Sequence, residues 1–155
     1  MLKTKIAVFV SGGGTNFEAL INAQENGKIP HGEIVLMVSS SKTAYALKRA
    51  ENHGIKSVVC SKKELGSQER FEEEILKNLE ENDIQLIVLA GFMSILSNEF
   101  TKKYENRIIN IHPSLIPSFC GEGFYGLHVH EAALKKGVKV TGATVHIVNE
   151  IPDGG

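Results

Sequence analysis

Residues 5–16 read Lys-Ile-Ala-Val-Phe-Val-Ser-Gly-Gly-Gly-Thr-Asn, an apolar run that stops at three glycines. A β-branched, apolar run of this length is typical of a buried strand, here residues 5–11. Residues 15–26 then predict a helix, with Thr15 as N-cap, Glu18 completing a capping box and Gly27 closing the far end. The stretch therefore predicts a strand, a tight glycine loop and a helix in immediate succession.

The rest of the chain repeats this alternation. Further strands are predicted at residues 33–39, 56–60, 85–90, 107–111 and 138–149, and further helices at residues 43–53, 67–82, 97–104 and 127–136. The acidic run at residues 72–74 is interpreted as a solvated face of its helix. Alternating strands and helices favour an α/β protein with right-handed crossovers. We expect a single domain over residues 1–155, with a Rossmann-like three-layer fold around a central, mostly parallel sheet.

The composition of the chain argues against several classes of protein. Hydrophobic residues make up 42% and charged residues 23% of the chain, and the net charge is −1, which gives no reason to expect nucleic acid or an anionic membrane as a partner. No apolar run is long enough to span a bilayer, and no signal peptide is recognised at the N-terminus. The two cysteines, Cys60 and Cys120, are interpreted as free thiols in a reducing cytoplasm.

Ligands of open parallel sheets bind beyond the carboxyl ends of the strands. That rule selects three loops, residues 12–16, 91–96 and 110–117, which each follow a predicted strand and are expected to converge.

The glycine loop is compatible with a phosphate site, because glycines allow close approach and a helix N-terminus presents free N–H groups. It is neither a dinucleotide fingerprint, because Phe17 stands where the last glycine is required, nor a P-loop. A single phosphate group is therefore favoured over a dinucleotide, and a tight turn without a ligand stays an alternative.

Asn110 and His112 end the strand predicted at residues 107–111. Side chains two apart on a strand point to one face, so an amide and an imidazolium N–H can stabilise the same oxyanion. Pro113 favours an extended His112. A buried histidine bonded only to the backbone is the alternative. Asp153 precedes two glycines and would favour the imidazolium if it lies near His112, although by itself it is typical of a turn.

Taken together, these motifs resemble a known family. Ser11-Gly12-x-Gly14-Thr15-Asn16, Leu89 through Leu96, Asn110-x-His112-Pro113-Ser114-Leu115-x-Pro117, Val145-His146-x-Val148 and Asp153-Gly154 occur in the order found in phosphoribosylglycinamide formyltransferases of purine biosynthesis. The Asn-x-His-Pro-Ser-Leu-x-Pro string is specific for the superfamily that uses 10-formyltetrahydrofolate. The resemblance covers the whole chain.

The resemblance implies formyl transfer from 10-formyltetrahydrofolate to the amine of 5′-phosphoribosylglycinamide, without a metal, by a cytoplasmic monomer or homodimer. Asn110, His112 and Asp153 would be catalytic. Gly14, Thr15 and Asn16 would bind the substrate phosphate. The folate would be bound by Gln68, Met93, Ser94, Ile95, Leu96, Asn110, Asn149, Glu150, Ile151, Pro152 and Asp153.

Three features depart from the commonest form of the family. Ser94 and Gln68 stand where many members carry a basic residue, and residues 119–126 form a longer loop, interpreted as an insertion or else as a lid. Family members continue beyond the Asp-Gly-Gly, so we expect the family's C-terminal segment to be missing here.

Four other functions are weighed. A 10-formyltetrahydrofolate hydrolase shares the Asn, His and Asp set, but the phosphate loop favours a sugar-phosphate acceptor. A methionyl-tRNA formyltransferase would need a basic surface. A zinc hydrolase built on His128, His130 and His112 is disfavoured, because residues two apart on a helix point away from each other. A phosphosugar-binding module without turnover is the last alternative.

Overall fold

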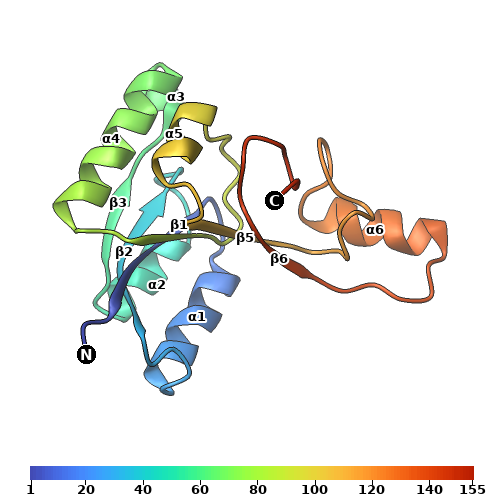
Figure 1. Cartoon of the computed structure of the whole chain (residues 1–155), viewed down its shortest axis with the longest axis horizontal. Helices are drawn as coiled ribbons and strands as arrows, with labels where there is room; N and C mark the ends of the chain where they lie inside the picture. The colour runs from blue at the N-terminus through green and yellow to red at the C-terminus, as the bar shows by residue number, and fades with distance from the viewer. The chain divides into compact units, whose positions relative to one another are not determined.

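The computed structural model describes residues 1–155 and divides into two compact units, Met1–Ser97 and Asn98–Gly155. The first unit contains β1 (Thr4–Val10), α1 (Thr15–Glu25), β2 (Gly32–Ser39), α2 (Ala46–Asn52), β3 (Lys56–Val59), α3 (Lys62–Leu65), α4 (Gln68–Glu81) and β4 (Leu86–Leu89). The second contains α5 (Asn98–Lys103), β5 (Ile108–His112), α6 (Leu127–Lys136) and β6 (Thr144–Ile147), and Figure 1 labels all of the elements except β4.

The predicted α/β class with a mostly parallel sheet is confirmed. In the first unit the strands lie in the order β3-β2-β1-β4, and every neighbouring pair is parallel. In the second unit β5 and β6 are antiparallel, and Asn110 is paired with His146. Strand β1 is mostly buried, as its unbroken apolar run predicted, and so is β2.

Helices cover both faces of the first unit's sheet. Phe17 and Ile21 of α1 and Ala46 and Ala50 of α2 belong to the same buried cluster as Val8 of β1. The other face carries α4, because Phe9 points away from Val8 and packs edge to face on Phe92, which stacks on Phe71. The three predicted layers are therefore present, and the loops at the strand ends are held by a rigid core.

Several element ends differ from the sequence prediction for identifiable reasons. Helix α2 begins at Ala46 rather than at residue 43, because hydroxyl groups of Ser39, Ser41 and Thr43 form local turn bonds that compete with helix. Strand β6 begins at Thr144 rather than at residue 138, where the N–H still bonds to the end of α6. The one-turn helix α3 was not predicted, whereas α6 has the predicted bounds.

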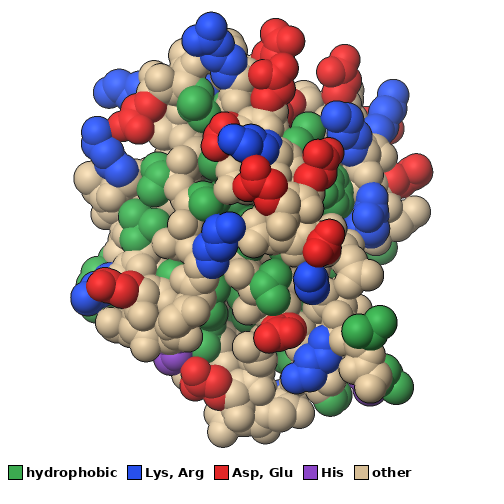
Figure 2. All heavy atoms as spheres, turned by 90° about the vertical axis from the view of Figure 1, so that its left-hand side faces the viewer, with side chains coloured by type: hydrophobic (Ala, Val, Ile, Leu, Met, Phe, Trp, Pro, Cys, Tyr) green, Lys and Arg blue, Asp and Glu red, His purple; other side chains and the backbone are tan.

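The surface is mixed in charge. On the face drawn in Figure 2, lysine and arginine side chains are interspersed with aspartate and glutamate, and apolar side chains lie between them. No helix combines the length and the apolar character that a membrane span requires. Both cysteines are free, with Cys60 buried and Cys120 half-buried.

Candidate active site

The glycine loop joins β1 to α1 through a left-handed N-cap. Gly14 has φ 74°, and α1 starts at Thr15 without a side-chain cap. A Cβ on Gly14 would lie 2.7 Å from the Cβ of Ala46, so both the backbone angle and the packing require glycine here. The predicted Thr15–Glu18 capping box is wrong, because Glu18 instead contacts Arg49 and His53.

The loop that follows β4 is bonded directly to the end of β1. The main-chain N–H of Ser11 donates to the carbonyl of Gly91 at 3.1 Å, and the N–H of Met93 donates to the Ser11 hydroxyl at 2.8 Å. The same hydroxyl lies 2.6 Å from that of Ser40 at the end of β2. Residues 12–16 and 91–96 therefore converge as predicted, and the convergence of residues 110–117 on them stays a prediction.

The candidate folate residues of the first unit lie in a braced loop. The Gln68 amide donates to the carbonyl of Ile95 at 3.0 Å and to the carboxylate of Glu72 at 2.6 Å. The side chains of Met93 and Ile95 are 56% and 85% exposed, which makes them available to an apolar ligand, while Ser94 and Leu96 are half-buried. The side-chain amide of Gln68 thus holds this loop in place.

Glu72 departs from the sequence prediction. The acidic run at residues 72–74 was interpreted as a solvated face, but Glu72 is buried and accepts hydrogen bonds from both the N–H and the hydroxyl of Ser97, each at 2.6 Å. Glu73 alone of the three is exposed. The interpretation was wrong at Glu72 because α4 turns that carboxylate toward Ser97, at the end of the loop of residues 91–96.

Asn110 and His112 lie on one face of β5, as their spacing predicted. The Asn110 amide nitrogen lies 3.2 Å from Nε2 of His146, and Nε2 of His112 lies 2.8 Å from the carbonyl of Phe119. His112 is buried. The strand end is fixed by Thr144, whose hydroxyl donates to the carbonyl of Ser114 at 2.7 Å and accepts from the N–H of Ile116 at 3.0 Å.

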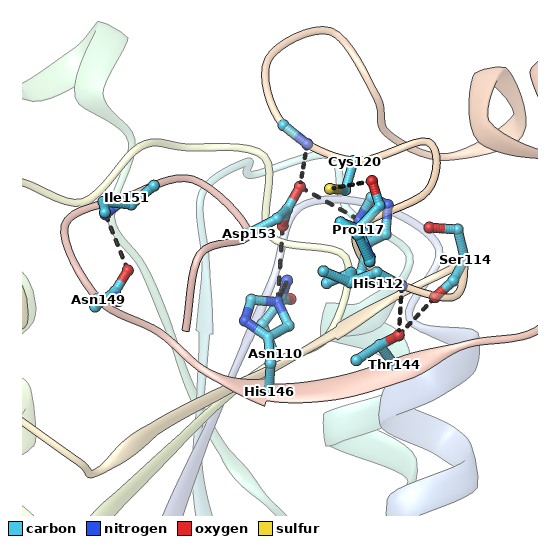
Figure 3. A network of polar contacts seen from close by, with 12 residues as sticks. Asn110, His112, Ser114, Pro117, Cys120, Thr144, His146, Asn149, Ile151 and Asp153 are labelled. Carbon is cyan, nitrogen blue, oxygen red and sulfur yellow. Dashed lines mark hydrogen bonds and ion pairs between the residues drawn. The ribbon is translucent and has the colours of Figure 1, made fainter.

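Asp153 completes the predicted catalytic set. Its Oδ2 lies 3.6 Å from Nδ1 of His112 and accepts the N–H of Gly121 at 2.8 Å, and its Oδ1 lies 3.7 Å from Nε2 of His146 (Figure 3). Asp153 adopts φ 53°, a conformation that aspartate and asparagine tolerate better than most residues. The structure therefore brings together all three residues predicted as catalytic, and Asp153 is more than a turn residue.

Both ring nitrogens of His112 face acceptors. One faces the main-chain carbonyl of Phe119 and the other faces the carboxylate of Asp153. The amide of Asn110 lies on the same face of β5, so the site groups an imidazole and an amide, the kind of donors that can stabilise a developing oxyanion.

The C-terminal residues of the folate set form a compact turn. Asn149 Oδ1 accepts the N–H of Ile151 at 2.9 Å, and the carbonyl of Ile151 accepts the N–H of Gly154 at 2.9 Å. This Asx turn brings the chain back so that Asp153 faces the end of β5 (Figure 3). Glu150, Ile151 and Pro152 are exposed on it.

His146 is a member of the cluster that sequence reasoning did not assign a role. Its side chain is 5% exposed, its Nε2 faces Asn110 and Asp153, and its Nδ1 is buried with no hydrogen-bond partner. His146 is placed beside Asn110 by the antiparallel register of β5 and β6, and that register was not predicted. The signal available in the sequence was a histidine in an apolar strand close to Asp153.

The histidines weighed for zinc lie elsewhere. His128 and His130 belong to α6, where Nδ1 of His128 lies 3.6 Å from Glu131. No group of three or more His, Cys, Asp or Glu side chains in residues 1–155 has the geometry to hold a metal ion.

Comparison with known proteins assigns this fold to a family. The chain belongs to the formyl transferase family, whose model matches residues 4–155. It is similar to the phosphoribosylglycinamide formyltransferase of Haemophilus influenzae, with 39% identity over 97% of this chain and 68% of that protein. It is also 47% identical, over 99% of its length, to the trifunctional purine biosynthetic protein adenosine-3 of Gallus gallus.

Solved structures agree in fold. The phosphoribosylglycinamide formyltransferase from Bacillus halodurans superposes with a TM-score of 0.88 at 39% identity, covering 98% of this chain and 75% of that chain. The chain spans 11–15% of the trifunctional relatives and about half of the chloroplastic ones.

Proposed function

We propose that this protein transfers the formyl group of 10-formyltetrahydrofolate to the amine of 5′-phosphoribosylglycinamide, a step of purine biosynthesis. The observation that carries the proposal is the approach of Asp153 to His112 at 3.6 Å, beside Asn110 on the same strand face. Family membership and relatives named phosphoribosylglycinamide formyltransferase support the same reaction.

The substrate amine attacks the formyl carbon, a new C–N bond forms, and the carbonyl oxygen becomes an oxyanion. Asn110 and the His112 imidazolium donate to that oxygen, and losing one such donor typically costs about 10²–10³ in rate. The intermediate then expels N10 of the folate, which takes up a proton as the former amine loses one. Asp153 keeps His112 cationic and relays the amine proton through water.

The Nε2–H of His112 is bonded to the Phe119 carbonyl at 2.8 Å. This N–H has to pass from the carbonyl to the oxyanion during the reaction. The loop of residues 119–126 is therefore expected to shift when the tetrahedral intermediate forms.

Substrate placement follows from the other candidate residues. Gly14, Thr15 and Asn16 would hold the phosphate at the N-terminus of α1, where the helix dipole favours an anion. Residues 93–96 and 149–153, with Gln68, would contact the folate. The chemistry calls for no metal, because the formyl group is already activated on N10. Two free thiols favour a reducing compartment such as the cytoplasm.

The test follows loss of the formyl group from 10-formyltetrahydrofolate by absorbance, with and without 5′-phosphoribosylglycinamide. We expect deformylation that depends on the ribonucleotide and falls by at least about 10²-fold in His112→Ala. His128→Ala, an exposed histidine on α6, is the matched control and should retain the activity. Deformylation that needs no ribonucleotide would indicate the hydrolase, and binding without turnover would indicate a phosphosugar-binding module.

A further inference from the structure

Helix α2 holds two consecutive carbonyls of the glycine loop. The N–H of Ala46 donates to the carbonyl of Gly12 at 3.2 Å, and Nε of Arg49 donates to the carbonyl of Gly13 at 2.8 Å. Gly14 then packs against Ala46 so closely that a Cβ would collide with it. Each residue of the loop is thus fixed from the α2 side.

We propose that Arg49 is a positioning residue for the substrate phosphate, because it turns the N–H groups of the glycine loop toward the ligand. The inference rests on the proposed function, which places a phosphate at this loop. In a planar trans peptide the C=O and the following N–H point in opposite directions. Carbonyls held toward α2 therefore direct the N–H groups of Gly13 and Gly14 away from α2.

The loop carries no side chain at Gly12 or Gly13, and a Cβ built on either residue meets no atom within 4 Å. The N–H groups of Gly13 and Gly14 donate to no other group in the protein. Together with the N-terminus of α1, they are a set of donors of the kind that binds phosphate.

Arg49 is itself fixed by two further contacts. Its NH1 lies 3.3 Å from the carboxylate of Glu18 in the first turn of α1, and its guanidinium lies 5.0 Å from the centre of the Tyr45 ring. The side chain is 25% exposed, and that of Glu18 is 27% exposed. The guanidinium of Arg49, which belongs to α2, therefore contacts both the glycine loop and α1.

Arg49 also neutralises a charge that would oppose the ligand. Glu18 is the acidic residue in the first turn of α1, close to the predicted phosphate position. His53 lies 3.0 Å from the same carboxylate, and hydrogen bonds to His53 and Arg49 lower the pKa of Glu18, so the carboxylate stays ionised. Removing Arg49 would leave this negative charge less compensated and the Gly13 carbonyl without its donor.

The experiment measures kcat and both KM values for Arg49→Gln, Arg49→Lys and Lys48→Gln. Lys48 is the matched control, because it lies on the same helix and pairs with Glu51 without contacting the loop. We expect Arg49→Gln to raise the KM for the ribonucleotide roughly tenfold, the usual effect of losing a charged hydrogen bond. The folate KM and kcat should change less than about twofold, and Lys48→Gln should match the wild type.

The Arg49→Lys variant tests whether the hydrogen-bonding geometry of the Arg49 side chain matters or only its charge. Lysine keeps the cation but lacks the rigid fork that contacts both the Gly13 carbonyl and Glu18, so its KM should stay close to that of the glutamine variant. A lysine variant with the wild-type KM would overturn the positioning role. So would an equal rise of both KM values in Arg49→Gln.

A binding measurement keeps the inference independent of turnover. Ribose 5-phosphate is titrated into ¹⁵N-labelled wild type and variants, and the amide signals of Gly13 and Gly14 are followed together with the thermal midpoint. We expect these two signals to shift in the wild type and in Lys48→Gln, and to need roughly tenfold more ligand in the Arg49 variants. If the wild type shows no turnover but this pattern holds, the proposed reaction fails while the role of Arg49 stands. Unshifted glycine signals in the wild type would overturn that role.

Discussion

Oδ2 of Asp153 lies 3.6 Å from Nδ1 of His112, and the same oxygen accepts the N–H of Gly121. One carboxylate atom thus connects His112, which we propose to be catalytic, to the loop of residues 119–126. Because that loop also supplies the Phe119 carbonyl that bonds to Nε2, both nitrogens of the imidazole are controlled from outside β5. The orientation of the His112 ring is set by these neighbours.

The Asp153→Asn variant isolates the charge of this carboxylate. Asparagine tolerates the φ of 53° and keeps one oxygen to accept from Gly121, but it no longer compensates an imidazolium. We expect kcat to fall by about 10²-fold with little change in the thermal midpoint. The assay is deformylation at saturating substrates, and Glu131→Gln, exposed on α6, is the control. A kcat within a factor of about two of the wild type would contradict the role of Asp153.

His146 offers a test of the second imidazole in the cluster. Its Nε2 lies 3.2 Å from the Asn110 amide and 3.7 Å from Asp153, while its Nδ1 has no partner. Glutamine can present a polar group near the position of Nε2, whereas leucine cannot. We expect His146→Leu to lower kcat about tenfold and His146→Gln to retain most of the activity.

The control for His146 is Val145→Ala, which alters the opposite, exposed face of β6. Steady-state kinetics over a range of both substrates separate an effect on kcat from one on binding. Equal losses in His146→Leu and His146→Gln would mean that the imidazole acts through its shape and packing rather than through Nε2.

The fold was largely predictable because the sequence marks where many of its strands and helices end. Apolar runs that end in glycine or proline marked the strands, and helical periodicity with a terminal Gly137 gave the bounds of α6. Asn110 and His112 could be predicted to act together because a strand has a period of two. These inferences need only local sequence.

The failures at Glu18, Glu72 and His146 depend on contacts between distant residues. Glu18 looked like part of a capping box, but Arg49 and His53 of α2 take its carboxylate. Glu72 looked solvated until Ser97 was placed against it. His146 acquired a role only through the register of β6 on β5. Such pairings follow from packing, which no local pattern specifies.

Glu72 should be required for the stability of the loop of residues 91–96. It is buried and accepts from Gln68 and twice from Ser97, so truncation removes three hydrogen bonds that hold this loop. We expect Glu72→Ala to lower the free energy of unfolding by about 2–3 kcal/mol, measured by urea denaturation, and to raise the folate KM. Glu73→Ala, exposed on the same helix, should cost less than about 0.5 kcal/mol. Equal losses in the two variants would contradict the bracing role of Glu72.

The two cysteines should differ in reactivity. Burial raises the pKa of Cys60 to about 11, so its thiolate is scarce at neutral pH, and no solvent reaches it. Cys120 is half-buried, and its thiol donates to the Pro117 carbonyl in the loop beside His112. We expect a disulfide reagent at pH 8 to modify Cys120 first and Cys60 only on unfolding. The Cys120→Ser variant is the control, and rapid reaction of its remaining thiol would contradict the burial of Cys60.

His53 predicts how stability varies with pH. Hydrogen bonds to Glu25 and Glu18 raise the pKa of His53 above 6.5 in the folded state, while the pKa of Glu18 is lowered below 4.5. A raised histidine pKa contributes stability that is complete below pH 6.5 and is lost as the pH rises through the folded pKa. A lowered carboxyl pKa contributes stability that is present above pH 4.5 and is lost as the pH falls.

The stabilisation from this cluster should therefore be greatest between pH 4.5 and 6.5. Urea denaturation of the wild type and His53→Gln at intervals from pH 4 to 9 measures it. We expect the difference in unfolding free energy to be constant near pH 6 and to shrink as the pH rises above the folded pKa of His53. In Glu25→Gln one negative charge beside His53 is lost, so the decline should begin at a lower pH. A difference that grows with rising pH would have the wrong sign and would exclude a protonated His53 as the link between α1 and α2.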